Sequence, residues 1–208
     1  MFKRKLLSVL LAGILVLTVF TPVGAQRPGP DYSDPQVIQS LLNELQNAGS
    51  QAQEYFKKLP PEAQETLLTA LTVAHVETQT TDNPAVAKIL PNGSGCGTLT
   101  TSRTGYSAVG LKLWRYNQQV YRCWNGSKLT TAYRQNRWGE VYAPLWQFAG
   151  HTGGWTRGGT GQWSFIAWTQ GDFRLCFGGW GIGCVQHSYP WIEQGVYGNG
   201  TYYGNSGG

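Results

Sequence analysis

The spacing of apolar residues changes along the chain and divides it into two parts. Between residues 34 and 77 the apolar positions recur every three or four residues, which is typical of amphipathic helices. Asp34 followed by Pro35 predicts a helix start, and Gly49 predicts its end. The apolar face of this helix would be Val37, Ile38, Leu41, Leu42 and Leu45. We expect a short second helix over 50–59, a third from about 62 to 77, and a loop over the polar residues 78–84.

From Gly95 onward, short runs rich in β-branched and aromatic residues alternate with turn signals. Asn125-Gly126 and Asn199-Gly200 each stand between two such runs, which is a strong hairpin signal. Gly171-Asp172 predicts a further turn inside the run 162–177. About eight short strands result, so the sequence predicts an all-β, antiparallel sandwich or barrel preceded by a small N-terminal α-helical segment.

Two finer expectations concern turns in the β region. A two-residue turn at Asn125-Gly126 would place Arg122 opposite Leu129. The stretch 150–161 contains six glycines in twelve residues, which predicts a long loop.

The first 25 residues have the layout of a secretory signal peptide. Lys3, Arg4 and Lys5 precede an apolar run over 6–20, and small residues up to Ala25 follow. An uncleaved membrane anchor is the alternative, but a spanning helix needs roughly 20 apolar residues. We therefore expect cleavage after Ala25 and a secreted, extracellular protein without stable membrane insertion. The expected divisions are a signal peptide (1–25), a helical segment (26–92) and a β domain (93–208).

Four cysteines in an exported chain indicate disulfides, and three pairings are open. We favour Cys176–Cys184, which closes a short Gly-rich loop, and hence Cys96–Cys123. Cys184-x-x-His187 has the spacing of half a metal site, but a disulfide accounts better for its cysteine. We expect no metal and no cofactor.

Charge separates the two parts as well. Residues 26–94 hold four bases and eight acids, whereas residues 95–208 hold nine bases and three acids. These can be two independently solvated surfaces. The sharper hypothesis is that the acidic helices dock on the basic face of the β domain and mask it.

Catalytic carboxylates are scarce in the β region, where the acids are Glu140, Asp172 and Glu193. A glycoside hydrolase generally needs two carboxyl groups across the scissile bond. Asp172 is explained as a turn residue, so Glu140 and Glu193 remain as the pair of a hydrolase hypothesis. No nucleophile elbow or phosphate-binding loop is present, so the interpretation leans away from an enzyme.

The remaining signal combines aromatic and basic residues. Exposed tryptophans offer flat faces to sugar rings, and arginine donates hydrogen bonds to hydroxyls, carboxylates and phosphates. The candidate ligand-binding residues are Trp155, Arg157, Trp180, Trp124, Trp138, Arg134 and Arg137. Other aromatics are expected in the core, namely Trp114, Trp146, Trp163, Trp168, Phe165 and Tyr133.

These observations favour a secreted, non-enzymatic binding module for polysaccharide or for an anionic polymer of the cell envelope. No nucleic-acid partner is expected. One alternative is a bacteriocin-like antagonist or inhibitor whose helical region is a pro-segment. The other is the glycan-acting hydrolase that uses Glu140 or Glu193.

The sequence over about 95–205 resembles small secreted β-rich bacterial proteins of uncharacterised function. The likeness rests on spaced stretches such as Leu113-Trp114, Cys123-Trp124-Asn125-Gly126, Gln170-Gly171-Asp172-Phe173 and Tyr189-Pro190-Trp191-Ile192. It implies a secreted β domain and carries no activity.

Overall fold

The computed structural model describes residues 29–83, 93–177 and 183–208. Residues 31–208 form one compact unit. Its helices are α1 (Pro35–Asn47), α2 (Ala52–Lys58) and α3 (Pro61–Leu71). Its strands are β1 (Val73–Asn83), β2 (Gly95–Ser107), β3 (Lys112–Trp124), β4 (Leu129–Val141), β5 (Trp146–Gly158), β6 (Ser164–Cys176), β7 (Cys184–Ser188), β8 (Trp191–Tyr197) and β9 (Tyr202–Gly207).

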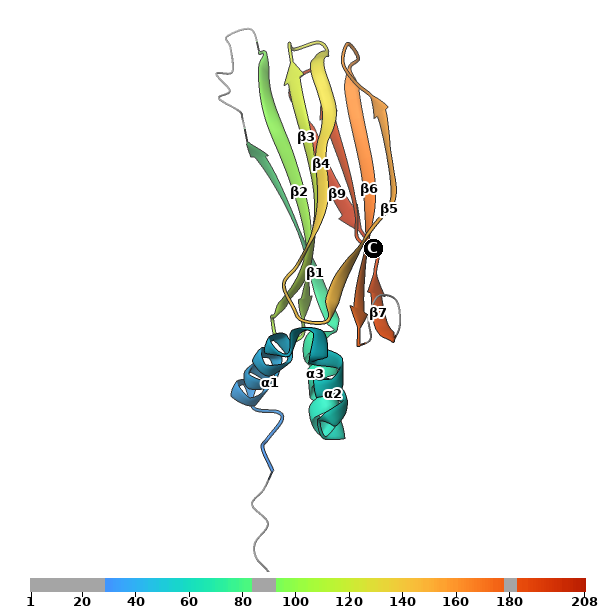
Figure 1. Cartoon of the computed structure of the whole chain (residues 1–208). Coiled ribbons are helices and arrows are strands. Elements are labelled where there is room, and N and C mark those ends of the chain that lie inside the picture. The colour runs from blue at the N-terminus through green and yellow to red at the C-terminus, as the bar shows by residue number, and fades with distance from the viewer. Residues whose placement is uncertain (1–28, 84–92, 178–182) are drawn as a thin grey trace, which may run out of the picture. The chain divides into compact units, whose positions relative to one another are not determined.

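The strands form two antiparallel sheets that pack face to face, as Figure 1 shows. The first sheet has the order β1-β2-β3-β4, and the second has the order β5-β6-β8-β9. β7 pairs with the end of β6 that β8 leaves free. The predicted fold class, an antiparallel sandwich or barrel with a small helical segment before it, is confirmed, and the two sheets make it a sandwich.

The first helix forms as its sequence predicts. The Asp34 carboxylate accepts a hydrogen bond from the main-chain nitrogen of Gln36 and so caps the helix. The third helix ends at Leu71, so its predicted continuation to residue 77 is wrong, as is the loop predicted after it. Residues 73–83 form the edge strand β1 because their valines and threonines suit a pleated, half-buried surface.

The hairpin at Asn125-Gly126 is confirmed, but its predicted register is wrong. Trp124 pairs with Leu129, and Arg122 pairs with Ala132. The side-chain oxygen of Asn125 accepts hydrogen bonds from the main-chain nitrogens of Ser127 and Lys128. This local bonding stabilises a connection longer than two residues.

Two further turn predictions fail in the second sheet. Residues 150–158 belong to β5 rather than to a loop, and β6 runs through Gly171-Asp172 without a turn. Glycine fits at two of these positions because an aromatic ring lies over the strand there. A Cβ at Gly171 would meet the ring of Tyr116, and a Cβ at Gly153 would meet the ring of Trp168.

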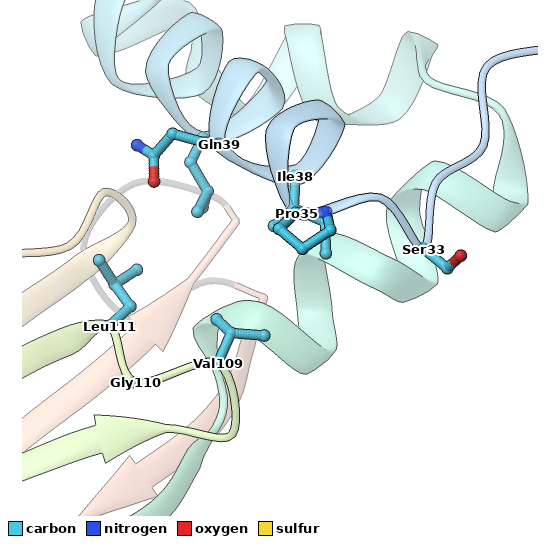
Figure 2. A pocket seen from close by; sticks show the side chains of 8 residues that line it. Ser33, Pro35, Ile38, Gln39, Val109, Gly110 and Leu111 are labelled. Atoms are coloured by element: carbon cyan, nitrogen blue, oxygen red, sulfur yellow. The ribbon is translucent and has the colours of Figure 1, made fainter.

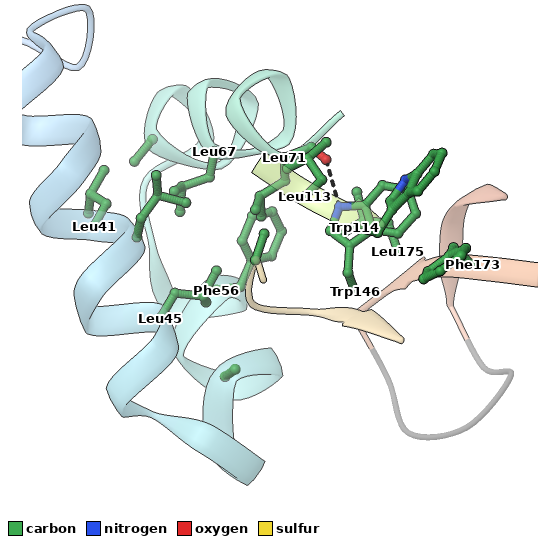
Figure 3. Close-up of a cluster of buried hydrophobic side chains, with 14 of the residues drawn as sticks. Leu41, Leu45, Phe56, Leu67, Leu71, Leu113, Trp114, Trp146, Phe173 and Leu175 are labelled. Atoms are coloured by element: carbon green, nitrogen blue, oxygen red, sulfur yellow. Dashed lines mark hydrogen bonds between the residues drawn. The ribbon is translucent and has the colours of Figure 1, made fainter. Parts of the chain in front are cut away.

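The helices and the end of the sandwich share one hydrophobic core, seen in Figure 3. Leu45, Leu67 and Leu71 are fully buried from the helical side, and Trp114 and Phe173 are fully buried from the sheets. The indole nitrogen of Trp146 donates to the main-chain oxygen of Leu71 at 2.9 Å. A second, smaller cluster lies farther along the sandwich around Leu99, Val120, Leu129, Phe165 and Val196.

The core predictions hold for part of the aromatic set. Trp114, Trp146 and Phe165 are buried. Trp163 and Tyr133 were expected in the core and are instead 50% and 48% exposed. Trp168 is half-buried on the outer face of the second sheet.

Both favoured disulfides are present. Cys96 and Cys123 face each other across β2 and β3, and Cys176 and Cys184 join β6 to β7. Cys184 is therefore not a metal ligand or a free thiol. Among the described residues, no helix is long and apolar enough to cross a membrane.

Candidate functional site

The outer face of the second sheet carries a continuous row of side chains across four strands. Register pairs Trp155 of β5 with Trp168 of β6, Trp168 with Glu193 of β8, and Glu193 with Asn205 of β9. Their sequence neighbours point the other way, since Ala167 and Gln194 are buried between the sheets. Alternation along each strand then directs the whole row, called here the Trp155 row, to solvent.

The aromatic end of the row is reinforced by ring stacking and by an arginine. The rings of Trp155 and Trp168 are stacked, with centroids 6.3 Å apart and planes 11° apart. Trp155 is 42% exposed. The guanidinium of Arg157 lies over the Trp155 ring, 5.7 Å from its centroid. Trp155 and Arg157 thus act together, although they lie on a strand and not in a loop.

The polar end of the row is held in place by a tyrosine. The Tyr203 hydroxyl donates to the Glu193 carboxylate at 2.9 Å. Burial, together with the hydrogen bond to Glu193, raises the pKa of Tyr203 to about 12. Tyr203 therefore stays a neutral donor at physiological pH, and Glu193 keeps an oxygen for another partner.

Arg134 and Arg137 lie elsewhere, in a seam between β4 and β5, the edge strands of the two sheets. Arg134 donates through Nη2 to the main-chain oxygens of Trp155 and Trp168, at 2.7 and 2.8 Å. Arg137 donates through Nη1 to the main-chain oxygen of Gly153 at 2.9 Å. These two arginines, called here the arginine seam, tie the first sheet to the main chain beneath the Trp155 row.

Tyrosine and histidine extend the seam inward. The Tyr116 hydroxyl lies 2.7 Å from Thr169 Oγ1 and 2.9 Å from His151 Nδ1. Burial, then the positive charges of Arg137 and Arg134, lower the pKa of His151 below its ordinary value. The imidazole is therefore neutral near pH 7.

The structure places Trp124 and Trp138 away from both groups. Trp124 is half-buried. Its ring lies against the main chain of Gly95 and Gly200, where a Cβ would meet it. Trp138 lies on the outer face of the first sheet and donates to the Glu140 carboxylate at 2.7 Å. Trp180 lies outside the described residues.

Glu140 and Glu193 do not share a cleft. Glu140 is on the outer face of the first sheet, whereas Glu193 is on the outer face of the second. Burial of Glu140 opposes ionisation, but hydrogen bonds from Tyr142 and Trp138 and the charges of nearby bases prevail and lower its pKa. A general acid needs a raised pKa, so the lowered pKa of Glu140 does not suit that role. The placement of Glu140 and Glu193 on different sheets does not suit a hydrolase pair either.

The carboxylate of Asp172 is also already engaged, in this case by a neighbouring arginine. It is buried, and its Oδ2 accepts two hydrogen bonds from Arg174, at 2.8 and 2.5 Å. It supports β6 rather than a turn. Among the described residues, no group of three or more His, Cys, Asp or Glu side chains is placed to hold a metal ion.

A cavity of about 540 Å³ lies between α1 and the β2–β3 turn (Figure 2). Its walls are apolar side chains such as Ile38, Leu42 and Leu111, and its polar side chains are Ser33 and Gln39. Among the residues that the structure describes, no charged or aromatic side chain lines it. It offers neither a titratable group nor a stacking surface.

Sequence reasoning missed Trp168, Asn205 and Tyr203 as members of the site, and it considered Glu193 only as a hydrolase carboxylate. In β6 the residues Phe165, Ala167 and Thr169 face inward, which turns Trp168 outward. That alternation was visible in the sequence. The alternation alone did not decide which face of β6 points inward, because Ile166 and Trp168 make the outward face almost as apolar as the inward one.

Comparison of the chain with known protein families, with curated proteins and with solved structures gives no match.

Proposed function

We propose that this protein is a secreted, non-enzymatic module that binds polysaccharide on the outer face of its second sheet. The observation that carries the proposal is the Trp155 row, in which a stacked indole pair continues into a carboxylate and an amide on the same face. Sugar rings present apolar C–H faces and polar edges, and this row offers a matching partner for each.

Rigidity of the row supports the proposal. Trp155 is braced by Trp168, and Glu193 is braced by Tyr203. Binding therefore orders few side chains, which lowers its entropic cost. A row that runs across four strands also suits an extended polymer better than a small molecule, which needs a concave pocket.

Secretion is proposed from two features. The chain begins with the layout of a signal peptide, and its four cysteines form two disulfides of the kind found in oxidising compartments.

The test is retention of the mature chain on insoluble polysaccharides and on isolated cell walls. We expect Trp155→Ala and Trp168→Ala each to weaken retention about ten-fold or more, since stacked aromatics dominate such contacts. Tyr133→Ala is the matched control because Tyr133 is 48% exposed on the opposite sheet. Equal retention of all three variants, or no retention of the parent chain on any polymer, would refute the proposal.

A further inference from the structure

The arginine seam holds two cationic groups that the chain does not neutralise. Within the described residues, no carboxylate lies within ion-pair distance, 4.0 Å, of Arg134 or Arg137. Arg122 and Arg174, by contrast, each pair with an aspartate. Partly buried charge without a counter-charge is costly in a protein, so an anionic partner would stabilise the seam.

Several donors in the seam are free. In the part of the chain that the structure describes, no residue accepts a hydrogen bond from Arg134 Nη1 or from Arg137 Nη2. Neither atom is among the buried polar atoms that lack a partner, so each keeps some contact with solvent. Other atoms of the same guanidinium groups are fixed by main-chain oxygens, which leaves the free N–H groups in a set orientation.

The absence of a side chain at Gly154 lets both guanidinium groups approach β5 at this position. A Cβ at this position would overlap Arg137 Nη1 and would lie 3.4 Å from Arg134 Nη1. The two guanidinium groups therefore converge on a position in β5 that has no side chain. His151 stands beside them, and its lowered pKa disfavours the protonated form, so the positive charge here comes from the two arginines.

The geometry points to a site for an oxyanion, and we infer that the polysaccharide bound by this protein carries carboxylate or sulfate groups. The inference rests on the proposed function and names the chemical class of its ligand. The seam adjoins the Trp155 row directly, because Arg134 donates to the main-chain oxygens of Trp155 and Trp168. A polymer stacked on Trp155 at this sheet edge can place an anionic substituent against the free donors.

Three polymers that share one backbone test the charge requirement: dextran, carboxymethyl-dextran and dextran sulfate. Retention of the mature chain is compared at fixed ionic strength. We expect at least one charged derivative to bind about ten-fold more tightly than dextran, from the energy of charged hydrogen bonds. Equal binding to all three would overturn the inference.

Variants then locate the site. Arg137→Gln should weaken binding to the charged derivative roughly ten-fold, and Gly154→Ala should do the same without changing net charge, because it displaces the Arg137 guanidinium. Lys128→Gln, in the exposed 125–128 turn, is the control for a loss of one positive charge. If Lys128→Gln weakens binding as much as Arg137→Gln and Gly154→Ala do, the polymer responds only to the overall positive charge of the protein, and the anion site does not exist.

Two further measurements distinguish a failure of the anion site from a failure of the polysaccharide-binding row. Loss of binding in Trp155→Ala with none in Arg137→Gln and Gly154→Ala would keep the polysaccharide row and reject the anion site. Loss in the seam variants with none in Trp155→Ala would keep the anion site and reject the row. Inorganic sulfate is titrated as well, and binding as tight as that of dextran sulfate would assign the site to a free oxyanion and reject the polymer.

Discussion

Glycine and aromatic residues act as partners at the scale of single residues. Tyr203 covers Gly195, and Trp191 covers Gly207, since a Cβ at either glycine would overlap the ring. Several glycines of the β strands, Gly153 and Gly171 among them, are therefore places where a ring lies close against the main chain. This pairing explains how a domain poor in leucine and isoleucine keeps broad aromatic surfaces in fixed positions.

His151 predicts how stability depends on pH. Its pKa is lowered in the folded state by burial and by Arg137 and Arg134, so the unfolded chain binds the proton more readily. The stabilising contribution is complete above the ordinary pKa near 6.5 and is lost as pH falls through that value towards the lowered one. The thermal midpoint of the parent chain should therefore fall more steeply between pH 7.5 and 5 than that of His151→Gln.

His75→Gln is the matched control for this measurement. His75 is an exposed histidine on the outer face of the first sheet, stacked on Tyr106. The groups that face His151 are Tyr116, Phe148, Arg134 and Arg137. If the His151 and His75 variants follow the same pH curve, the seam does not disfavour protonation.

At the scale of elements, β6 organises the second sheet. It pairs with β5 along one side and with β8 and then β7 along the other. A single long strand at this place gives the row its straight alignment from Trp155 to Asn205. The turn predicted at Gly171-Asp172 would have divided the strand and the face it carries.

The contact between α3 and β5 gives a second prediction. Trp146→Phe keeps an aromatic ring but removes the hydrogen bond to the buried oxygen of Leu71. Leaving that oxygen unpaired should lower the free energy of unfolding by about 1–3 kcal/mol. Urea denaturation measures the change. Trp163→Phe, at a 50% exposed site, should change stability by less than about 0.5 kcal/mol, and an equal effect of both would contradict the role of this contact.

At the scale of the whole molecule, the helices belong to the same folding unit as the sandwich. They pack against its end, where they cover Leu113, Trp114 and Trp146 (Figures 1 and 3). The Phe56 ring also lies 4.2 Å from that of Phe177. None of these contacts involves the arginine seam, so the hypothesis that the helices mask a basic face finds no support in the contacts.

A shortened chain that begins at residue 73 tests whether the sandwich needs the helices to cover its end. Without the helices, the buried side chains at the end of the sandwich become solvent-exposed, so the shortened chain should bind hydrophobic dyes and self-associate. Its affinity for charged dextran should not rise. A monomeric, dye-free shortened chain would instead support the alternative in which the helical region is a removable pro-segment.

The sequence by itself determined the local features of this protein. Asp34 and Pro35 begin a helix, Asn125-Gly126 makes a hairpin, and the cysteine spacing led to the correct disulfides. Each depends on residues that bond within a few positions of one another or on elimination among few alternatives. Short strand runs and frequent turn signals were likewise sufficient for an antiparallel β class, a sandwich or a barrel, and the pairing of the strands made it a sandwich.

Only the tertiary structure decided which face each aromatic residue occupies. Trp163 and Tyr133 had the same local signals as buried Trp114, and glycine-rich 150–158 had the signals of a loop until its pairing with β6 was known. The seam and the Trp155 row each combine strands that are distant in the chain, and their arrangement follows from sheet order and register. A side chain's function here depends on which other sheet or strand lies opposite it, and no spacing along one strand contains that information.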